Sequence, residues 1–116
     1  MPRSSNPPNQ LTPVVFHTLL ALTDGSLHGY AISQRVEEVT EGQVKMGPGT
    51  LYGTLQRIQA AGYVDEVEPT KVSGPHVERR RYYALTRAGR SALKAEAIRL
   101  AKAVDLARSH AVLDNS

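Results

Sequence analysis

The sequence contains no cysteine and no tryptophan, only one phenylalanine, and no long hydrophobic run. Without cysteine the chain has no disulfide, no thiol nucleophile and no thiolate metal site. Its apolar stretches, such as Val14-Val15-Phe16, are far shorter than the roughly 20 residues that span a membrane. Residues 1–10 have no apolar stretch and are not typical of a secretory signal. We therefore expect a cytoplasmic protein with no membrane partner.

The signatures of common enzymes and metal sites are also missing. The sequence lacks GxSxG, HExxH and the phosphate-binding loop GxxxxGK[ST]. Its four histidines are widely separated and have no nearby carboxylate pattern typical of metal ligands: His17, His28, His76 and His110. We therefore predict no catalytic residues, no metal and no cofactor, and a protein that is not an enzyme.

What is present is enough for one folded domain. The chain has 116 residues, of which 41% are hydrophobic and 22% are charged, as in an ordinary globular domain. The formal net charge of +3 is unevenly distributed, because residues 1–70 carry −3 and residues 71–116 carry +6. A local basic excess favours a polyanionic partner, although an ordinary solvated surface can carry the same charge.

Three short helices are predicted in the first half of the chain. Their predicted starts are Thr12-Pro13, His28-Gly29 and Gly47-Pro48, and their ends are Asp24-Gly25, Glu41-Gly42 and Ala60-Ala61-Gly62. Their predicted apolar faces are Val15, Phe16, Leu19, Leu20 and Leu22, then Ile32, Val36 and Val39, and finally Leu51, Leu55 and Ile58.

A hairpin and a long final helix follow. Residues 63–68 and 81–85 are rich in β-formers and predict two strands joined by a long tip. A helix is predicted from Thr86 to about Leu113, with an apolar seam of Leu93, Ala97, Leu100, Val104, Ala107 and Ala111. A helix of this length, about 42 Å, favours pairing with a second copy, although it can also pack on its own domain.

The predicted fold class is therefore mainly α with a small antiparallel β-hairpin. In this order the elements predict a winged helix-turn-helix domain with a long C-terminal dimerisation helix. We expect a flexible arm at residues 1–10, the DNA-binding domain at residues 11–85, and the dimerisation helix and tail at residues 86–116. A two-fold homodimer would place its two reading helices about 34 Å apart, which predicts an inverted-repeat operator in double-stranded promoter DNA.

The predicted hairpin is the first candidate DNA contact. Its candidate residues are Lys71, His76, Arg79, Arg80 and Arg81. Guanidinium groups bind phosphate and release counterions, so this wing would add salt-sensitive affinity. Side chains alternate along a strand, so at least one of the three arginines points elsewhere, for example toward a carboxylate such as Glu66 or Glu68. A solvated charge run with cross-strand ion pairs is the alternative.

The third helix is the candidate reading helix. Opposite its apolar face it presents Gly49, Thr50, Gly53, Thr54 and Arg57. We expect Thr50 and Thr54 to touch phosphates or base edges and Tyr52 to bind a phosphate, or else to pack under the hairpin. Lys45, just before the helix, is either a phosphate contact or an ordinary solvated lysine.

Several motifs together resemble the PadR family of transcriptional regulators. They are Leu19-Leu20-Ala21-Leu22, Leu27-His28-Gly29-Tyr30, Pro48-Gly49-Thr50-Leu51-Tyr52, Gly62-Tyr63-Val64, and the run from Arg81 to Gly89. The resemblance covers about residues 14–89 and is to the compact branch of the family with one C-terminal helix. It differs at Gly47, where the family usually has Ser, and at Gly53, where it usually has Pro.

The resemblance implies a dimeric repressor that is released from near-palindromic promoter DNA by a small effector. It implies phosphate contact by Tyr30, further DNA contacts by Gly49, Thr50 and Tyr52, and backbone or minor-groove contacts by the wing arginines. For a small apolar or aromatic effector the candidate lining is Phe16, Leu20, Leu100 and Val104, although these residues can equally be core or interface. The alternative function is a winged-helix protein–protein interaction module, since a fold does not fix a function.

Overall fold

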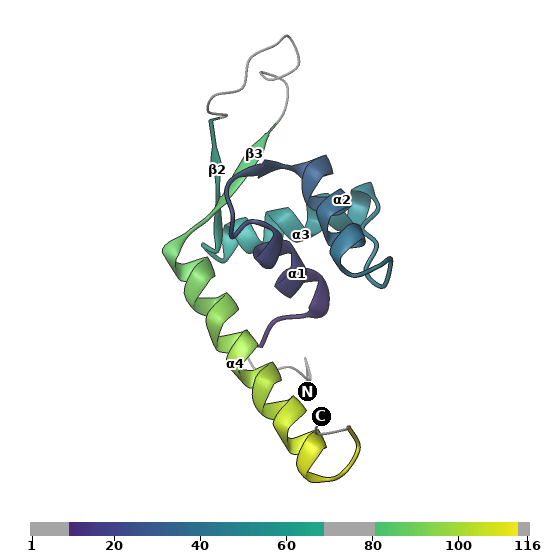
Figure 1. Ribbon diagram of the computed structural model, residues 1–116. Coiled ribbons are helices and arrows are strands. Elements are labelled where there is room, and N and C mark those ends of the chain that lie inside the picture. Colours follow the sequence, from purple (N-terminus) through teal and green to yellow (C-terminus); the bar gives the residue numbers. More distant parts are fainter. Residues whose placement is uncertain (1–9, 69–80, 114–116) are drawn as a thin grey trace, which may run out of the picture.

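The computed structural model describes residues 10–68 and 81–113, which form four helices and a small sheet (Figure 1). In chain order the elements are α1 (Pro13–Ala21), β1 (Leu27–His28), α2 (Gly29–Val39), α3 (Pro48–Ala60), β2 (Val64–Val67), β3 (Tyr82–Leu85) and α4 (Arg87–Ser109). The predicted helices and hairpin are therefore present. No helix within the described ranges is both long enough and apolar enough to cross a membrane.

Three of the four helices begin at a side chain that accepts a backbone hydrogen bond. The Oγ1 of Thr12 accepts from the Val15 amide at 3.2 Å, and the Nδ1 of His28 accepts from the Ala31 amide at 3.3 Å. The Oγ1 of Thr86 accepts from the Gly89 amide at 2.9 Å. These bonds satisfy amides that have no partner inside the helix. By contrast, α3 has no side-chain cap at Gly47 and begins at Pro48, whose fixed φ suits the first helical position.

The sheet has one strand that the sequence pattern did not predict. Its order is β1-β3-β2, and all neighbouring strands are antiparallel. The extra strand β1 has only two residues, and Leu27 lies opposite Tyr83. Because β1 leads directly into α2, it fixes the start of that helix against the base of the hairpin.

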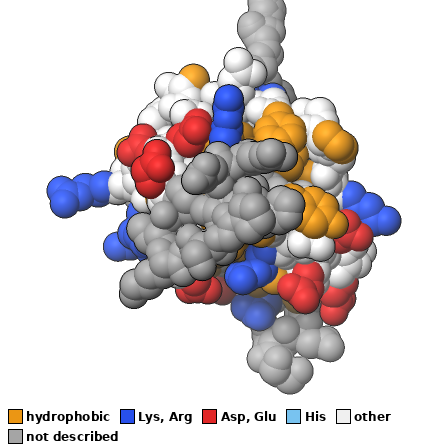
Figure 2. Space-filling view, turned by 90° about the horizontal axis from the view of Figure 1, so that it is seen from above, with side chains coloured by type: hydrophobic (Ala, Val, Ile, Leu, Met, Phe, Trp, Pro, Cys, Tyr) orange, Lys and Arg blue, Asp and Glu red, His pale blue; other side chains and the backbone are white. Residues whose placement is uncertain are grey.

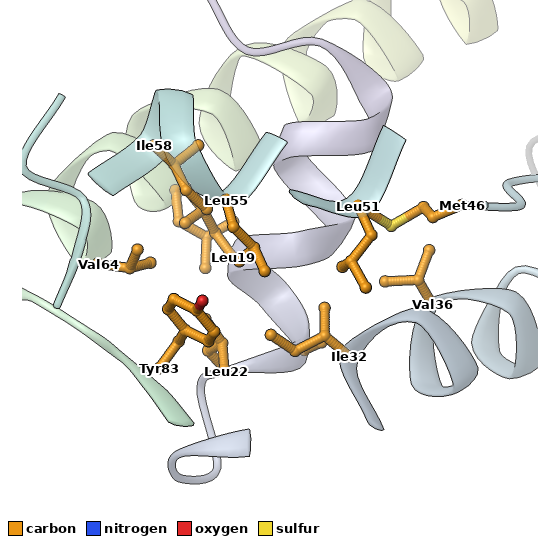
Figure 3. Close-up of a cluster of buried hydrophobic side chains, with 12 residues drawn as sticks. Leu19, Leu22, Ile32, Val36, Met46, Leu51, Leu55, Ile58, Val64 and Tyr83 are labelled. Carbon is orange, nitrogen blue, oxygen red and sulfur yellow. The ribbon is translucent and has the colours of Figure 1, made fainter. Parts of the chain in front are cut away.

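A single core joins the three short helices to the sheet (Figure 3). Its most deeply buried members include Leu19, Leu22, Ile32, Val36, Leu55 and Val64. Two residues predicted to be buried are exposed instead: Leu20 keeps 42% and Val39 keeps 57% of its surface. Leu20 lies on the outer side of α1, and Val39 is the last residue of α2, so neither is covered by another element of this chain.

Helix α4 packs on the domain only through its first half (Figure 1). Gly89, Leu93 and Glu96 are its buried residues, and Leu93 belongs to the core. The prediction that Leu93 lies at the interface between copies is therefore wrong, because its own domain already buries it. Ala111 is not on the seam either: α4 ends at Ser109, and Ala111 has a left-handed φ of 62°.

Candidate nucleic-acid interface

Helix α3 has a buried face and a polar outer face. Leu51, Thr54, Leu55 and Ile58 are buried, whereas Gly49, Thr50, Tyr52, Gln56, Arg57, Gln59 and Ala60 are exposed. This agrees with the predicted placement of Gly49, Thr50 and Arg57. The prediction that Thr54 touches DNA is wrong for this conformation, because its side chain is 0% exposed. Thr54 lies on the buried side of α3 together with Leu55.

Tyr52 lies against the start of α2 on one side and beside the base of the hairpin on the other. A Cβ atom added to Gly29 would lie 3.4 Å from both the Cε1 and the Oη of Tyr52. The tyrosine nevertheless keeps 55% of its surface exposed. The absence of a side chain at Gly29 therefore lets α2 support the ring of Tyr52 while its outer side stays open to a partner.

Tyr30 and Tyr52 border one surface between α2 and α3. Together with Ser33, Met46, Pro48 and Leu51, they line a hollow of about 160 Å³. Tyr30 is 64% exposed, and the Oγ of Ser33 donates to the Tyr30 carbonyl oxygen at 2.9 Å. Two tyrosine hydroxyls on one exposed surface provide hydrogen-bond donors for phosphate oxygens.

The base of the hairpin adds a second wall to α3. A hollow of about 260 Å³ lies between α3 and β3, lined by Tyr52, Leu55, Gln56, Gln59, Arg81 and Tyr83. The Nε of Arg81 lies 3.9 Å from Glu66 Oε2 across the sheet, as the strand alternation predicts for one wing arginine. Both side chains are well exposed, so this ion pair contributes little to stability. Burial, together with the charge of Glu66, raises the pKa of Tyr83.

The remaining predicted contacts divide into two groups. Lys45 is exposed in the loop between α2 and α3, and its Cε lies 3.8 Å from where Gly42 would carry a Cβ. Lys71, His76, Arg79 and Arg80 lie outside the described residues.

In the view of Figure 2, hydrophobic side chains gather on one side of the face, and lysine and arginine side chains alternate with clusters of aspartate and glutamate around it.

Most of the predicted seam on α4 is uncovered in the single chain. Leu100 is 37% and Val104 is 39% exposed; Ala97 is exposed as well, while Ala107 is half-buried. Of the predicted effector lining, Leu20, Leu100 and Val104 are exposed and Phe16 is half-buried, with its ring edge-on to that of His17. Within the described ranges, no three histidine or acidic side chains gather as a metal site.

Two features of this surface were not predicted. The first is the hydrogen bond from Arg57 to the buried Thr54. The second is the position of Gln56 and Gln59, which line the hollow between α3 and the hairpin. The sequence signal for the first pair is its spacing of three, which places two residues together on a helix. No sequence signal indicates the position of the two glutamines, because that position depends on how the hairpin packs against α3.

The order of these elements, with α3 beside a two-stranded hairpin, defines a winged helix-turn-helix domain. A family model described as "Transcriptional regulator PadR-like family" matches residues 18–95. The chain therefore belongs to the PadR-like family of transcriptional regulators, as the sequence motifs predicted. This family consists of transcriptional regulators rather than enzymes.

The chain is also similar to individual proteins. Transcriptional regulator Rv3488 of Mycobacterium tuberculosis is 37% identical over 84 residues, which cover 72% of each chain. An uncharacterized 37.1 kDa protein in transposon TN4556 of Streptomyces fradiae is 43% identical over 84 residues. That match covers 72% of this chain but only 22% of the longer relative. A solved PadR family transcription regulator from Clostridium difficile has the same fold, with a TM-score of 0.71 at 19% identity, covering 85% of this chain and 98% of that one.

Proposed function

We propose that this chain regulates transcription by binding a specific sequence of double-stranded promoter DNA. The observation that carries the proposal is the outer face of α3, where glycines and polar side chains lie between two exposed tyrosines and the base of the hairpin. Small residues let a helix approach the floor of the major groove, and hydroxyl groups and arginines bind phosphates at its edges. Tyr30, Lys45, Gly49, Thr50, Tyr52 and Arg81 are the proposed contacts that the structure describes.

The protein-interaction alternative fits this face less well. Every residue of α3 is described, and Tyr52 is its one exposed large hydrophobic side chain. A surface that binds another protein usually has a hydrophobic centre. The outer face of α3 instead has glycine and polar residues at its centre, which favours DNA.

We further propose that the active unit is a homodimer formed through α4, with a division at about residue 86 between the DNA-binding and dimerisation parts. Leu100 and Val104 are spaced by four and therefore lie on one face of the helix. They are exposed on the half of α4 that leaves the domain (Figure 1). A second copy would cover them and would place two α3 helices on one side of the duplex, which suits an inverted repeat.

Repression and release by an effector complete the proposal, and both rest on the family resemblance. The proposed effector is small and apolar or aromatic, and its proposed lining is Phe16, Leu20, Leu100 and Val104 at the dimer interface. The chain would act in the cytoplasm, where promoter DNA is found.

A gel-shift titration tests the proposal directly. The protein is titrated against the DNA upstream of its own gene and against a scrambled duplex of equal length, at two salt concentrations. We expect tighter binding to the upstream DNA, a steep loss of affinity with salt, and a shifted species that contains two protomers. Equal and weak binding to both duplexes, with no loss in salt, would favour the protein-interaction module instead.

A further inference from the structure

The side chain of Arg57 is folded back against α3. Its Nη2 donates to the Oγ1 of Thr54 at 3.3 Å, and its Nη1 lies 3.6 Å from where Gly53 would carry a Cβ. The guanidinium therefore lies over Gly53, one turn closer to the start of the helix than the Arg57 backbone. Thr54 is fully buried, so the hydroxyl that holds the arginine is itself fixed by the core.

Between Arg57 and the start of α3, the row of residues on the outer face of the helix consists of glycines. Gly49, Gly53 and Arg57 follow one another at a spacing of four and form one row on the outer face. A Cβ at Gly49 would have no atom of residues 10–68 or 81–113 within 4 Å. Long side chains on a helix lean toward its N-terminus, which here is the direction of this bare row. The two glycines thus leave space both for a close partner and for the arginine that lies over them.

The guanidinium is also available to a ligand. Among the described residues, no carboxylate lies within ion-pair distance of Arg57. The hydrogen bond to Thr54 uses one of the five N–H groups of Arg57, so the guanidinium still has a pair of N–H donors for a ligand. A solvated cation that only keeps a surface soluble does not require such an orienting contact from a buried hydroxyl.

We infer that Arg57 reads a guanine in the major groove and that Thr54 is its positioning residue. The inference rests on the proposed DNA-binding function and names the base that the site selects. A bidentate contact from arginine to the O6 and N7 of guanine is the commonest specific contact in the major groove. The reading helix presents its N-terminal half to the bases, which is where the side chain of Arg57 is directed.

Selection from a pool of duplexes with a randomised central window tests this assignment. The wild type is compared with Arg57→Ala, Arg57→Lys, Thr54→Val and Thr54→Ser, and Lys102→Ala on α4 serves as the control for the loss of one exposed positive charge. Each protein is also titrated against the wild-type selected site and against one fixed random duplex. Circular dichroism checks that each variant is folded.

We expect the wild type to select a motif with a guanine in each half-site and Arg57→Ala to lose the preference for that guanine. Its affinity for the selected site should fall by about tenfold to hundredfold, with less than a threefold loss on random DNA. Arg57→Lys keeps the positive charge but cannot make the bidentate contact, so it should also lack the preference for guanine. Thr54→Val should reduce the preference for guanine, and Thr54→Ser, which keeps the hydroxyl, should restore it.

Two outcomes would overturn the inference in different ways. If Arg57→Ala selects the same motif as the wild type and loses affinity equally on both duplexes, Arg57 binds phosphate and the guanine assignment is wrong. If the wild type enriches no motif at all, the proposed function fails and the inference fails with it. Should Thr54→Val not fold, the comparison of Arg57→Ala and Arg57→Lys with the wild type still decides whether Arg57 reads guanine.

Discussion

Gly89 lies so close to Tyr63 that the structure has no space for any other residue at this position. A Cβ added to Gly89 would lie 2.1 Å from the carbonyl oxygen of Tyr63 and 2.9 Å from its carbonyl carbon. The neighbouring Thr86 fixes this contact, because its amide donates to the same carbonyl oxygen at 3.0 Å and its hydroxyl donates to the Gly62 carbonyl at 2.6 Å. The first turn of α4 is thus held against the residue that leads into β2.

We therefore predict that Gly89→Ala destabilises the domain. The methyl group would meet the Leu85 side chain, 2.9 Å away, and also the backbone of Tyr63. Because that backbone cannot move aside as a side chain can, the strain should lower the free energy of unfolding by about 1–3 kcal/mol. Gly53→Ala is the matched control, because its Cβ would lie at an ordinary 3.6 Å from Arg57 and should add up to about 1 kcal/mol of helix propensity. Urea unfolding followed by circular dichroism measures both, and equal stability of the two variants would contradict the prediction.

The elements that hold Gly89 and Thr86 were largely predictable from local signals. Thr12, His28, Gly47 and Thr86 mark the four helix starts, because capping depends on residues close in sequence. The spacing of Leu51, Leu55 and Ile58 identified the inner face of α3 correctly. The contact between Gly89 and Tyr63 joins two elements distant in sequence, and no periodicity in either segment indicates it.

The errors arise where tertiary packing decides which residues are covered. Helical spacing predicts Thr54 on the face opposite Leu51, Leu55 and Ile58, yet the buried arc of α3 is wide enough to include it. Leu93 fits the seam of α4 by spacing, but the domain occupies the first half of that helix. The buried carboxylate of Glu96 was not predicted, since its partners include the backbone of Leu11, 85 residues away in sequence.

Glu96 should make the stability of the protein depend on acid pH. The hydrogen bonds from Arg99 lower the pKa of Glu96 below its ordinary 4.5; burial opposes this effect, and the Leu11 amide, 3.3 Å away, adds to it. A lowered pKa in the folded state means that the ionised carboxylate stabilises the fold above the ordinary value. This contribution is lost as the pH falls below 4.5 and through the lowered pKa.

Glu96→Gln should therefore be less stable than the wild type at neutral pH and should lose part of the acid dependence. Asp105→Asn is the control on the same helix, since Asp105 pairs with Arg108 at 3.5 Å but has a 78% exposed side chain. An exposed ion pair of this kind contributes little to stability, so Asp105→Asn should show the same stability and the same pH dependence as the wild type. Thermal unfolding from pH 3 to 7 measures the difference, and parallel curves for wild type and Glu96→Gln would exclude the assigned role.

The uncovered half of α4 leads to a prediction about assembly. Val104→Asp places a charge on the face that also contains Leu100, and in a dimer this charge would be buried without a partner. We expect the dimer dissociation constant to rise at least about tenfold, because even 1.4 kcal/mol produces that change. Fold and monomer stability should be retained, since Val104 is already 39% exposed in the single chain.

Ile98→Asp is the matched control for assembly. Ile98 is similarly hydrophobic and 47% exposed, but at 100° per residue it lies more than 100° around the helix from Val104. It should therefore leave the dimer intact. Sedimentation at several protein concentrations distinguishes the two variants, and a wild type that sediments as a monomer at micromolar concentration would contradict pairing through α4.

Arg81 leads to a prediction about the salt dependence of DNA binding. Its side chain is 74% exposed and forms a long ion pair with Glu66 Oε2 at 3.9 Å, so the guanidinium can leave this weak pair for a phosphate. Each phosphate contact that is lost lowers the slope of log affinity against log salt by about 0.9. Arg81→Ala should thus reduce the slope by about 0.9 for each duplex contact it makes and weaken binding to specific and random DNA alike. Lys102→Ala, which removes one exposed charge from α4, should leave the slope unchanged, and an equal slope for wild type and Arg81→Ala would remove the base of the hairpin from the interface.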